Sequence, residues 1–323
     1  MKKMISYALF ASLALFASCS QDETLEQTTN APGVLSFTTT LPTEGAQTKA
    51  ADENVQRYIM QLFYENAEGA MTTFVLNPSA GADDYSGQAT MENASGSFMI
   101  DGETLGLAEG TTYTAVFWAD YNAVDAASPT YNADYLNWVT YAGDLSNTPM
   151  TMAYCGTSQF TYGEDMAAAY SVTLRRAVAQ VNFVQSEGFT PTAGDNVYVN
   201  YTHYNVFNAL ENEIVTGENT SWQQNATIAT LSATPIAANE EIGSILTFAS
   251  ATSSITSNFS FYYNDAEAGA ATNVPLQANY QTNITGNYYA TSQTTTATFT
   301  VATDDAWGGT ANENEFDTAD TTE

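Results

Sequence analysis

Few side chains in this sequence could make or break covalent bonds. The 323 residues contain one histidine, His203, and two cysteines, Cys19 and Cys155. His203 is in phase with the apolar residues of VYVNYTHYN, so we expect it to pack on a sheet face. Nothing near Cys155 resembles a nucleophile elbow, and a buried core thiol is favoured over a Cys155–His203 dyad. Without a phosphate-binding glycine loop or His/Cys metal spacing, we expect no enzyme activity, no metal and no cofactor.

Acidic residues dominate the charge of the chain. There are 36 Asp and Glu against 6 Lys and Arg, a net charge of -30. This argues against nucleic acid as a partner, because phosphate neutralisation needs basic side chains. Acidic pairs occur at residues 83–84, 240–241 and 304–305. Adjacent residues on a strand point to opposite faces, so solvated turn acids are favoured over a glycosidase pair.

Tryptophan offers a second kind of chemistry, the stacking of a sugar ring on an aromatic face. Trp118, within TAVFWAD, has the surroundings of a core residue. Trp222, within ENTSWQQN, has polar neighbours and is the candidate glycan contact. A glycan-binding surface protein is therefore one function to weigh.

The N-terminus has the pattern of a secreted, lipid-anchored protein. Lys2 and Lys3 precede an apolar run at 5–17, and FASC follows at 16–19. This resembles a bacterial lipobox, which implies a signal peptide at 1–18 and acylation of Cys19, whose lipid would anchor the chain to the outer membrane. An ordinary signal peptide is the alternative. Residues 19–33 are polar and acidic, which predicts a flexible tether, and they resemble the signal that sends lipoproteins to the cell surface.

The rest of the chain has the pattern of an all-β protein. Short runs rich in Val, Ile, Phe, Tyr and Thr alternate with Gly, Asn and Asp turns about every ten residues. This predicts two antiparallel β-sandwich domains in tandem, at 34–187 and 188–308, followed by a disordered acidic tail at 309–323. The expected strands are 34–40, 57–65, 71–76, 96–100, 112–120, 135–141, 171–184, 196–207, 227–233, 244–250, 257–265, 273–280 and 296–307.

A pair of arginines interrupts the period of one expected strand. Val172 and Leu174 lie in one phase, and Ala177 and Val181 lie in the other. The one-residue slip at Arg175–Arg176 predicts a bulge or bend where the strand changes partners.

Three patches follow one another along the chain: VLSFTTT with the following loop and RYIMQLFYE, the mid-chain VTLRRAVAQVNFV, and the closing TATFTVATDDAWGG. In this order they resemble the fimbrillins, the transthyretin-like two-domain pilins of Bacteroidetes type V fimbriae, and related surface lipoproteins. The resemblance implies a surface lipoprotein that assembles with other pilin subunits. The resemblance also implies the assembly mechanism, in which a trypsin-like protease would remove the first strand and a strand of the next subunit would fill the groove.

The residues expected to serve that mechanism lie at the two ends of the mature chain. Lys49 lies in the polar loop after the first strand and is the candidate cleavage point. Arg57 is the second choice because it opens an apolar strand. Ala297, Phe299 and Val301 share one face of the last strand and form the candidate donor. The alternative for Lys49 is a solvated loop lysine with no role, and the alternative for the last strand is that it belongs to its own domain.

Overall fold

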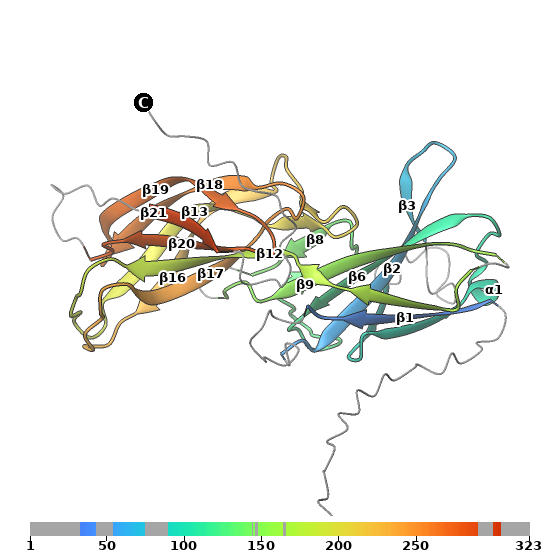
Figure 1. Ribbon diagram of the computed structural model, residues 1–323, viewed down its shortest axis with the longest axis horizontal. Coiled ribbons are helices and arrows are strands. Elements are labelled where there is room, and N and C mark those ends of the chain that lie inside the picture. Colours follow the sequence, from blue (N-terminus) through green and yellow to red (C-terminus); the bar gives the residue numbers. More distant parts are fainter. Residues whose placement is uncertain are drawn as a thin grey trace, which may run out of the picture.

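The computed structural model describes residues 33–42, 54–74, 90–143, 145, 148–163, 166–289 and 300–304. Within them the chain is almost entirely β, which confirms the predicted fold class. One short helix, α1 (Gly102–Leu105), is present. Figure 1 shows two lobes side by side, with strands β1–β6 in one and β16–β21 in the other. None of the described helices is long and apolar enough to cross a membrane.

The N-terminal lobe is a sandwich of two sheets. The first has the order β10 (Ala169–Thr173), β1 (Val34–Thr40) and β5 (Ser97–Asp101). The second has the order β11 (Arg175–Arg176), β9 (Ala153–Thr161), β6 (Thr112–Asp120), β2 (Arg57–Glu65) and β3 (Met71–Phe74), and β4 (Thr90–Asn93) also pairs with β2. An apolar core, which includes Leu35, Leu62 and Phe117, fills the space between the two sheets.

The C-terminal lobe is a second sandwich. One sheet has the order β17 (Glu240–Phe248), β12 (Val178–Gln185), β20 (Gln281–Gly286) and β21 (Thr300–Asp304). The facing sheet has the order β16 (Ser221–Thr230), β13 (Asn196–Tyr204), β18 (Ile255–Tyr263) and β19 (Ala266–Leu276). Strand β13 alternates between half-buried and buried residues, as the period of its sequence predicts.

A small sheet lies between the lobes, with the order β15 (Glu213–Ile214), β14 (Val206–Asn208), β8 (Val139–Tyr141) and β7 (Tyr131–Asn132). A second apolar core begins on the outer face of β2 and β6, at Ile59 and Trp118, and continues through this sheet to Phe248 of β17. The two sandwiches therefore share buried side chains.

The arginine pair marks the place where the chain changes sheets, as predicted. Strand β10 pairs with β1, β11 pairs with β9, and β12 pairs with β17 and β20. The chain thus enters the C-terminal sandwich at Val178. The predicted boundary between residues 187 and 188 comes after β12, whose partners are all C-terminal strands.

Two further predictions differ from the structure. Most pairings are antiparallel, but β1–β10 and β12–β20 are parallel. The expected strand 135–141 is a strand only from Val139, and residues 135–138 form a turn. The polar Asn137 interrupts the apolar run there, so the segment folds back instead of extending.

Candidate functional site

Strand β1 is the middle strand of its sheet. It pairs in parallel with β10 over Ser36–Thr40 and antiparallel with β5 over Val34–Thr38. Beyond the ladders, the backbone N of Ser36 donates to Ala168 O at 2.9 Å, and that of Thr39 donates to Gly96 O at 2.9 Å. Without β1, the facing edges of β5 and β10 would therefore both present unpaired backbone groups.

The inward side chains of β1 complete the core of the N-terminal sandwich. Leu35 and Phe37 are fully buried. The ring of Phe37 lies 5.6 Å from that of Phe117, 5.7 Å from that of Phe160 and 5.2 Å from that of Tyr170. Burial of each such side chain contributes roughly 1.5–3 kcal/mol, so β1 supplies a large part of the stability of its lobe.

The C-terminal end of β1 leads directly into the loop that carries the candidate cleavage point. The described chain continues through Leu41 and Pro42, and residues 43–53, which include Lys49, lie outside the described residues. Cys19 and the leader also lie outside them. The chain resumes at Asn54, just before β2.

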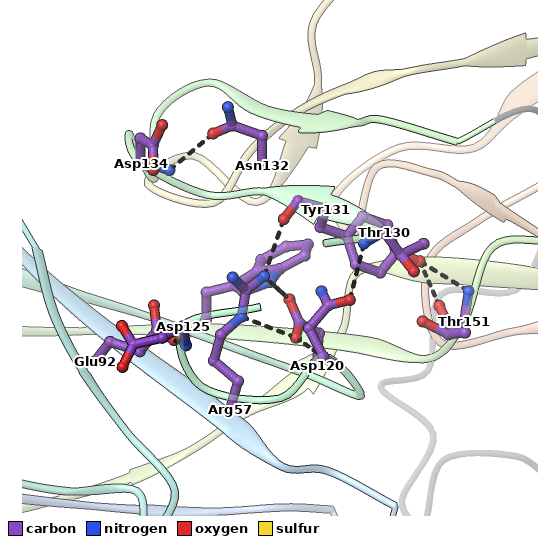
Figure 2. A network of polar contacts seen from close by, with 11 residues as sticks. Arg57, Glu92, Asp120, Asp125, Thr130, Tyr131, Asn132, Asp134 and Thr151 are labelled. Carbon is purple, nitrogen blue, oxygen red and sulfur yellow. Dashed lines mark hydrogen bonds and ion pairs between the residues drawn. The ribbon is translucent and has the colours of Figure 1, made fainter. Parts of the chain in front are cut away.

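Arg57, the second-choice cleavage point, is held inside the fold (Figure 2). Arg57 is 5% exposed. Its Nε and Nη2 donate to the two carboxylate oxygens of Asp120 at 3.1 and 2.5 Å. Nη2 also donates to Tyr131 O at 3.0 Å. A protease must bind an extended, accessible segment, so cleavage after Arg57 would require β2 to leave its sheet.

The carboxylate of Asp120 is the centre of this network. It also accepts hydrogen bonds from Trp118 Nε1 at 2.7 Å and from the backbone N of Asn122 at 2.9 Å. Four donors on two oxygens compensate for burying the charge. The hydroxyl of Tyr131 donates to Thr151 O, and burial raises its pKa well above the usual range. The network ties β2 and β6 to β7.

The candidate donor strand pairs within its own domain. Strand β21 is the edge strand next to β20, with Val301 opposite Ile284. Ala297 and Phe299 lie outside the described residues. In this conformation the last strand therefore completes its own sandwich, which is the alternative that the sequence left open.

The thiol and the imidazole are both buried. Cys155 is 1% exposed, its Sγ donates to Asn212 Oδ1 at 3.1 Å, and burial raises its pKa to about 12. His203 lies on the buried face of β13, as predicted, and burial lowers its pKa to about 4. At neutral pH both groups are uncharged. No cluster of metal-ligating side chains occurs in the part of the chain that the structure describes.

The exposed aromatic residues differ from those the sequence singled out. Trp118 is fully buried, as expected. Trp222 lies in β16 opposite His203, but its side chain is not among the parts of the chain that the structure describes. Tyr135 and Trp138, which sequence reasoning placed in a strand, are exposed in the β7–β8 turn. The polar residues Asp134 and Asn137 beside them were the available signal for that turn.

Comparison with solved structures finds proteins of similar length in Bacteroidetes. A candidate cell adhesion protein from Bacteroides eggerthii shares 14% identity over 85% of this chain and 97% of its own, with a TM-score of 0.42. A candidate polysaccharide-binding protein from Bacteroides thetaiotaomicron shares 10% identity over 87% and 98%, with a TM-score of 0.48. The fimbrial anchor protein Mfa2 from Porphyromonas gingivalis shares 8% identity over 84% and 98%, with a TM-score of 0.45.

Two of these three neighbours carry the names of adhesion or fimbrial proteins, and one carries the name of a polysaccharide-binding protein. No curated protein matches the chain. The model of one family of unknown function, DUF6562, matches residues 27–322, and the chain belongs to that family.

Proposed function

We propose that this protein is a surface-anchored lipoprotein of the outer membrane that serves as an adhesive or structural subunit and joins other pilin subunits by exchange of β1. The lipid on Cys19 would anchor it, and cleavage after Lys49 would release β1 together with the lipid. The position of β1 carries the proposal. It is a central strand, bounded on both sides by ladders, and a single cut in the loop that follows it would separate it from the chain.

The geometry of the groove supports strand exchange. An incoming strand would find the ladder edges of β5 and β10 and the space vacated by Leu35 and Phe37. Backbone hydrogen bonds would give affinity, and the two pockets would select large apolar side chains at alternate positions. The sequence of the candidate donor predicts this alternation, with Ala297, Phe299 and Val301 expected on one face.

The second candidate function is a glycan-binding lipoprotein that does not polymerise. The pairing of β21 within its own sheet favours it, because a donor strand would first have to leave β20. The two functions make opposite predictions for a chain cut after Lys49.

A reversible lock on β1 tests the proposal. The backbone N of Ser36 points to β10, so Ser36 and Met99 of β5 form a non-hydrogen-bonded pair, whose Cα atoms lie about 4.5 Å apart in such ladders. That spacing suits a disulfide. The soluble chain from residue 20 is prepared as wild type, as Lys49→Gln and as Ser36→Cys/Met99→Cys, treated with trypsin, and followed by mass spectrometry and electron microscopy.

We expect wild type to be cut after Lys49, to lose β1 and to form filaments, and Lys49→Gln to stay intact. The locked variant should be cut yet remain monomeric until a reductant is added. A cut wild-type chain that stays monomeric would favour the glycan-binding function. Filaments formed equally well by the oxidised, locked variant would show that β1 need not leave.

A further inference from the structure

Two exposed aromatic side chains are presented by one tight turn. Tyr135 is 42% exposed and Trp138 is 50% exposed. The backbone N of Trp138 donates to Tyr135 O at 2.9 Å, which is the closing bond of a β-turn. Such a turn brings the Cα atoms of its first and last residues within about 7 Å. The two exposed side chains therefore start from backbone positions that are close together on the surface.

The turn is fixed to the body of the protein from beneath. Leu136, its second residue, is fully buried. The backbone N of Leu136 donates to the buried Gln61 Oε1 at 2.7 Å, and its carbonyl accepts from the backbone N of Ala209 at 2.8 Å. Strand β2 and the segment after β14 thus hold the turn on both sides. A ligand would not have to order this segment on binding, which lowers the entropic cost.

Polar side chains lie beside the aromatic pair. Asp134 and Asn132 are exposed, and Asn137 is half-buried. The backbone N of Asp134 donates to Asn132 Oδ1 at 3.1 Å, which fixes the approach to the turn (Figure 2). Carboxylate and amide groups next to aromatic faces can hydrogen-bond to hydroxyl groups while a ring stacks on apolar C–H faces.

We propose that Tyr135 and Trp138 form a binding site for a neutral glycan, with a pyranose ring stacked on Trp138 and with Asp134 accepting hydrogen bonds from its hydroxyl groups. The net charge of -30 and the adjacent carboxylate disfavour sulfated or uronic acid sugars. This site is independent of the strand exchange proposed above, because β1 lies in a different sheet.

The distribution of apolar surface favours a small ligand over a protein partner. Within the described residues the other large exposed apolar side chains are Met71 and Met99. Met71 is opposite Glu65, at the far end of β2, and Met99 lies in β5 of the other sheet. A stable protein interface covers about 800 Å² on each partner, commonly around a cluster of apolar anchors. The turn offers two aromatic rings, which suits one or two sugar units.

A glycan array tests the proposal. The soluble chain from residue 20 is applied to an array of neutral, amino-substituted and anionic glycans, and the affinity for the best neutral glycan is then measured by calorimetry. The variants are Trp138→Ala, Trp138→Phe and Tyr135→Ala. Met99→Ala, which removes an exposed apolar side chain from β5, is the matched control, and circular dichroism checks that each variant is folded.

We expect binding to neutral glycans, a loss of at least tenfold in Trp138→Ala, a smaller loss in Trp138→Phe and Tyr135→Ala, and no change in Met99→Ala. The proposal is overturned if wild type binds no neutral glycan, if it binds only anionic glycans, or if the Tyr135→Ala/Trp138→Ala double variant binds as tightly as wild type. It is also overturned if a lysine-rich peptide, and no glycan, binds in a manner that depends on Trp138, since that would indicate a cationic protein partner.

Discussion

At the residue scale, burial decides the state of the groups that could act as acid, base or nucleophile. Cys155 and His203 lie inside the protein, and burial disfavours the charged form of each. The thiol therefore keeps its proton at neutral pH, and the imidazole stays neutral well below the usual pKa of histidine. The groups with access to solvent include carboxylates such as those of Glu240 and Glu241, together with amides and aromatic rings of the turns.

The buried imidazole predicts a pH dependence of stability. The pKa of His203 is about 4 in the folded chain and about 6.5 in the unfolded chain. Between these pH values the unfolded state binds more protons, so the free energy of unfolding falls as the pH falls, by up to about 1.4 kcal/mol per pH unit. We expect His203→Phe to lack this contribution. Urea unfolding of both proteins between pH 6.5 and 4.5 measures the difference, and parallel pH profiles would contradict it.

At the scale of the strand, the fit of β1 against its neighbours can be tested at a glycine. Gly96, just before β5, has φ +68°, and a Cβ there would lie 2.4 Å from Thr39 Oγ1 near the end of β1. Gly106, after α1, has φ +72°, but a Cβ there would meet nothing within 4 Å. Alanine at either position carries the cost of the left-handed conformation, about 1–2 kcal/mol.

Gly96→Ala should therefore lower the free energy of unfolding by about 1–3 kcal/mol more than Gly106→Ala, because it also displaces Thr39. Urea unfolding of the two variants gives this difference directly. Equal losses of unfolding free energy in the two variants would show that Thr39, near the end of β1, can shift without a cost in free energy.

The strands whose bounds sequence reasoning predicted correctly are runs rich in apolar, aromatic and β-branched residues. Strands β1, β2 and β6 have the predicted bounds. Strand β20 was missed, because the buried positions of QTNITG include Thr282 and Gly286, which weaken the apolar signal. The sequence located the strand and the loop of the candidate site, but not the central position of β1, since its partner β10 lies about 130 residues away and no local pattern encodes that contact.

At the scale of the whole molecule, the two sandwiches are joined by a continuous apolar core. The ring of Trp118 in β6 lies 5.6 Å from that of Tyr131, 6.1 Å from that of Phe207 and 6.2 Å from that of Phe248. These four aromatic side chains come from the N-terminal sandwich, the small sheet and the C-terminal sandwich. Opening the junction would expose all of them, so separation of the lobes is strongly opposed by the hydrophobic effect.

The shared core predicts that the two sandwiches unfold together. Phe98→Ala removes a side chain that packs only within the N-terminal core, where its ring lies 5.8 Å from that of Phe117, and should cost about 3–5 kcal/mol. If the junction couples the lobes, this loss also lowers the protection of C-terminal amides, although no contact there has changed. Hydrogen exchange of the amides of β13 and β18, compared between Phe98→Ala and wild type, measures how much of the lost stability reaches the C-terminal sandwich.

Phe248→Ala, at the junction itself, should weaken the coupling, so that the lobes then unfold at separate denaturant concentrations. Independent lobes would instead leave β13 and β18 fully protected in Phe98→Ala, because nothing would carry the loss across the junction.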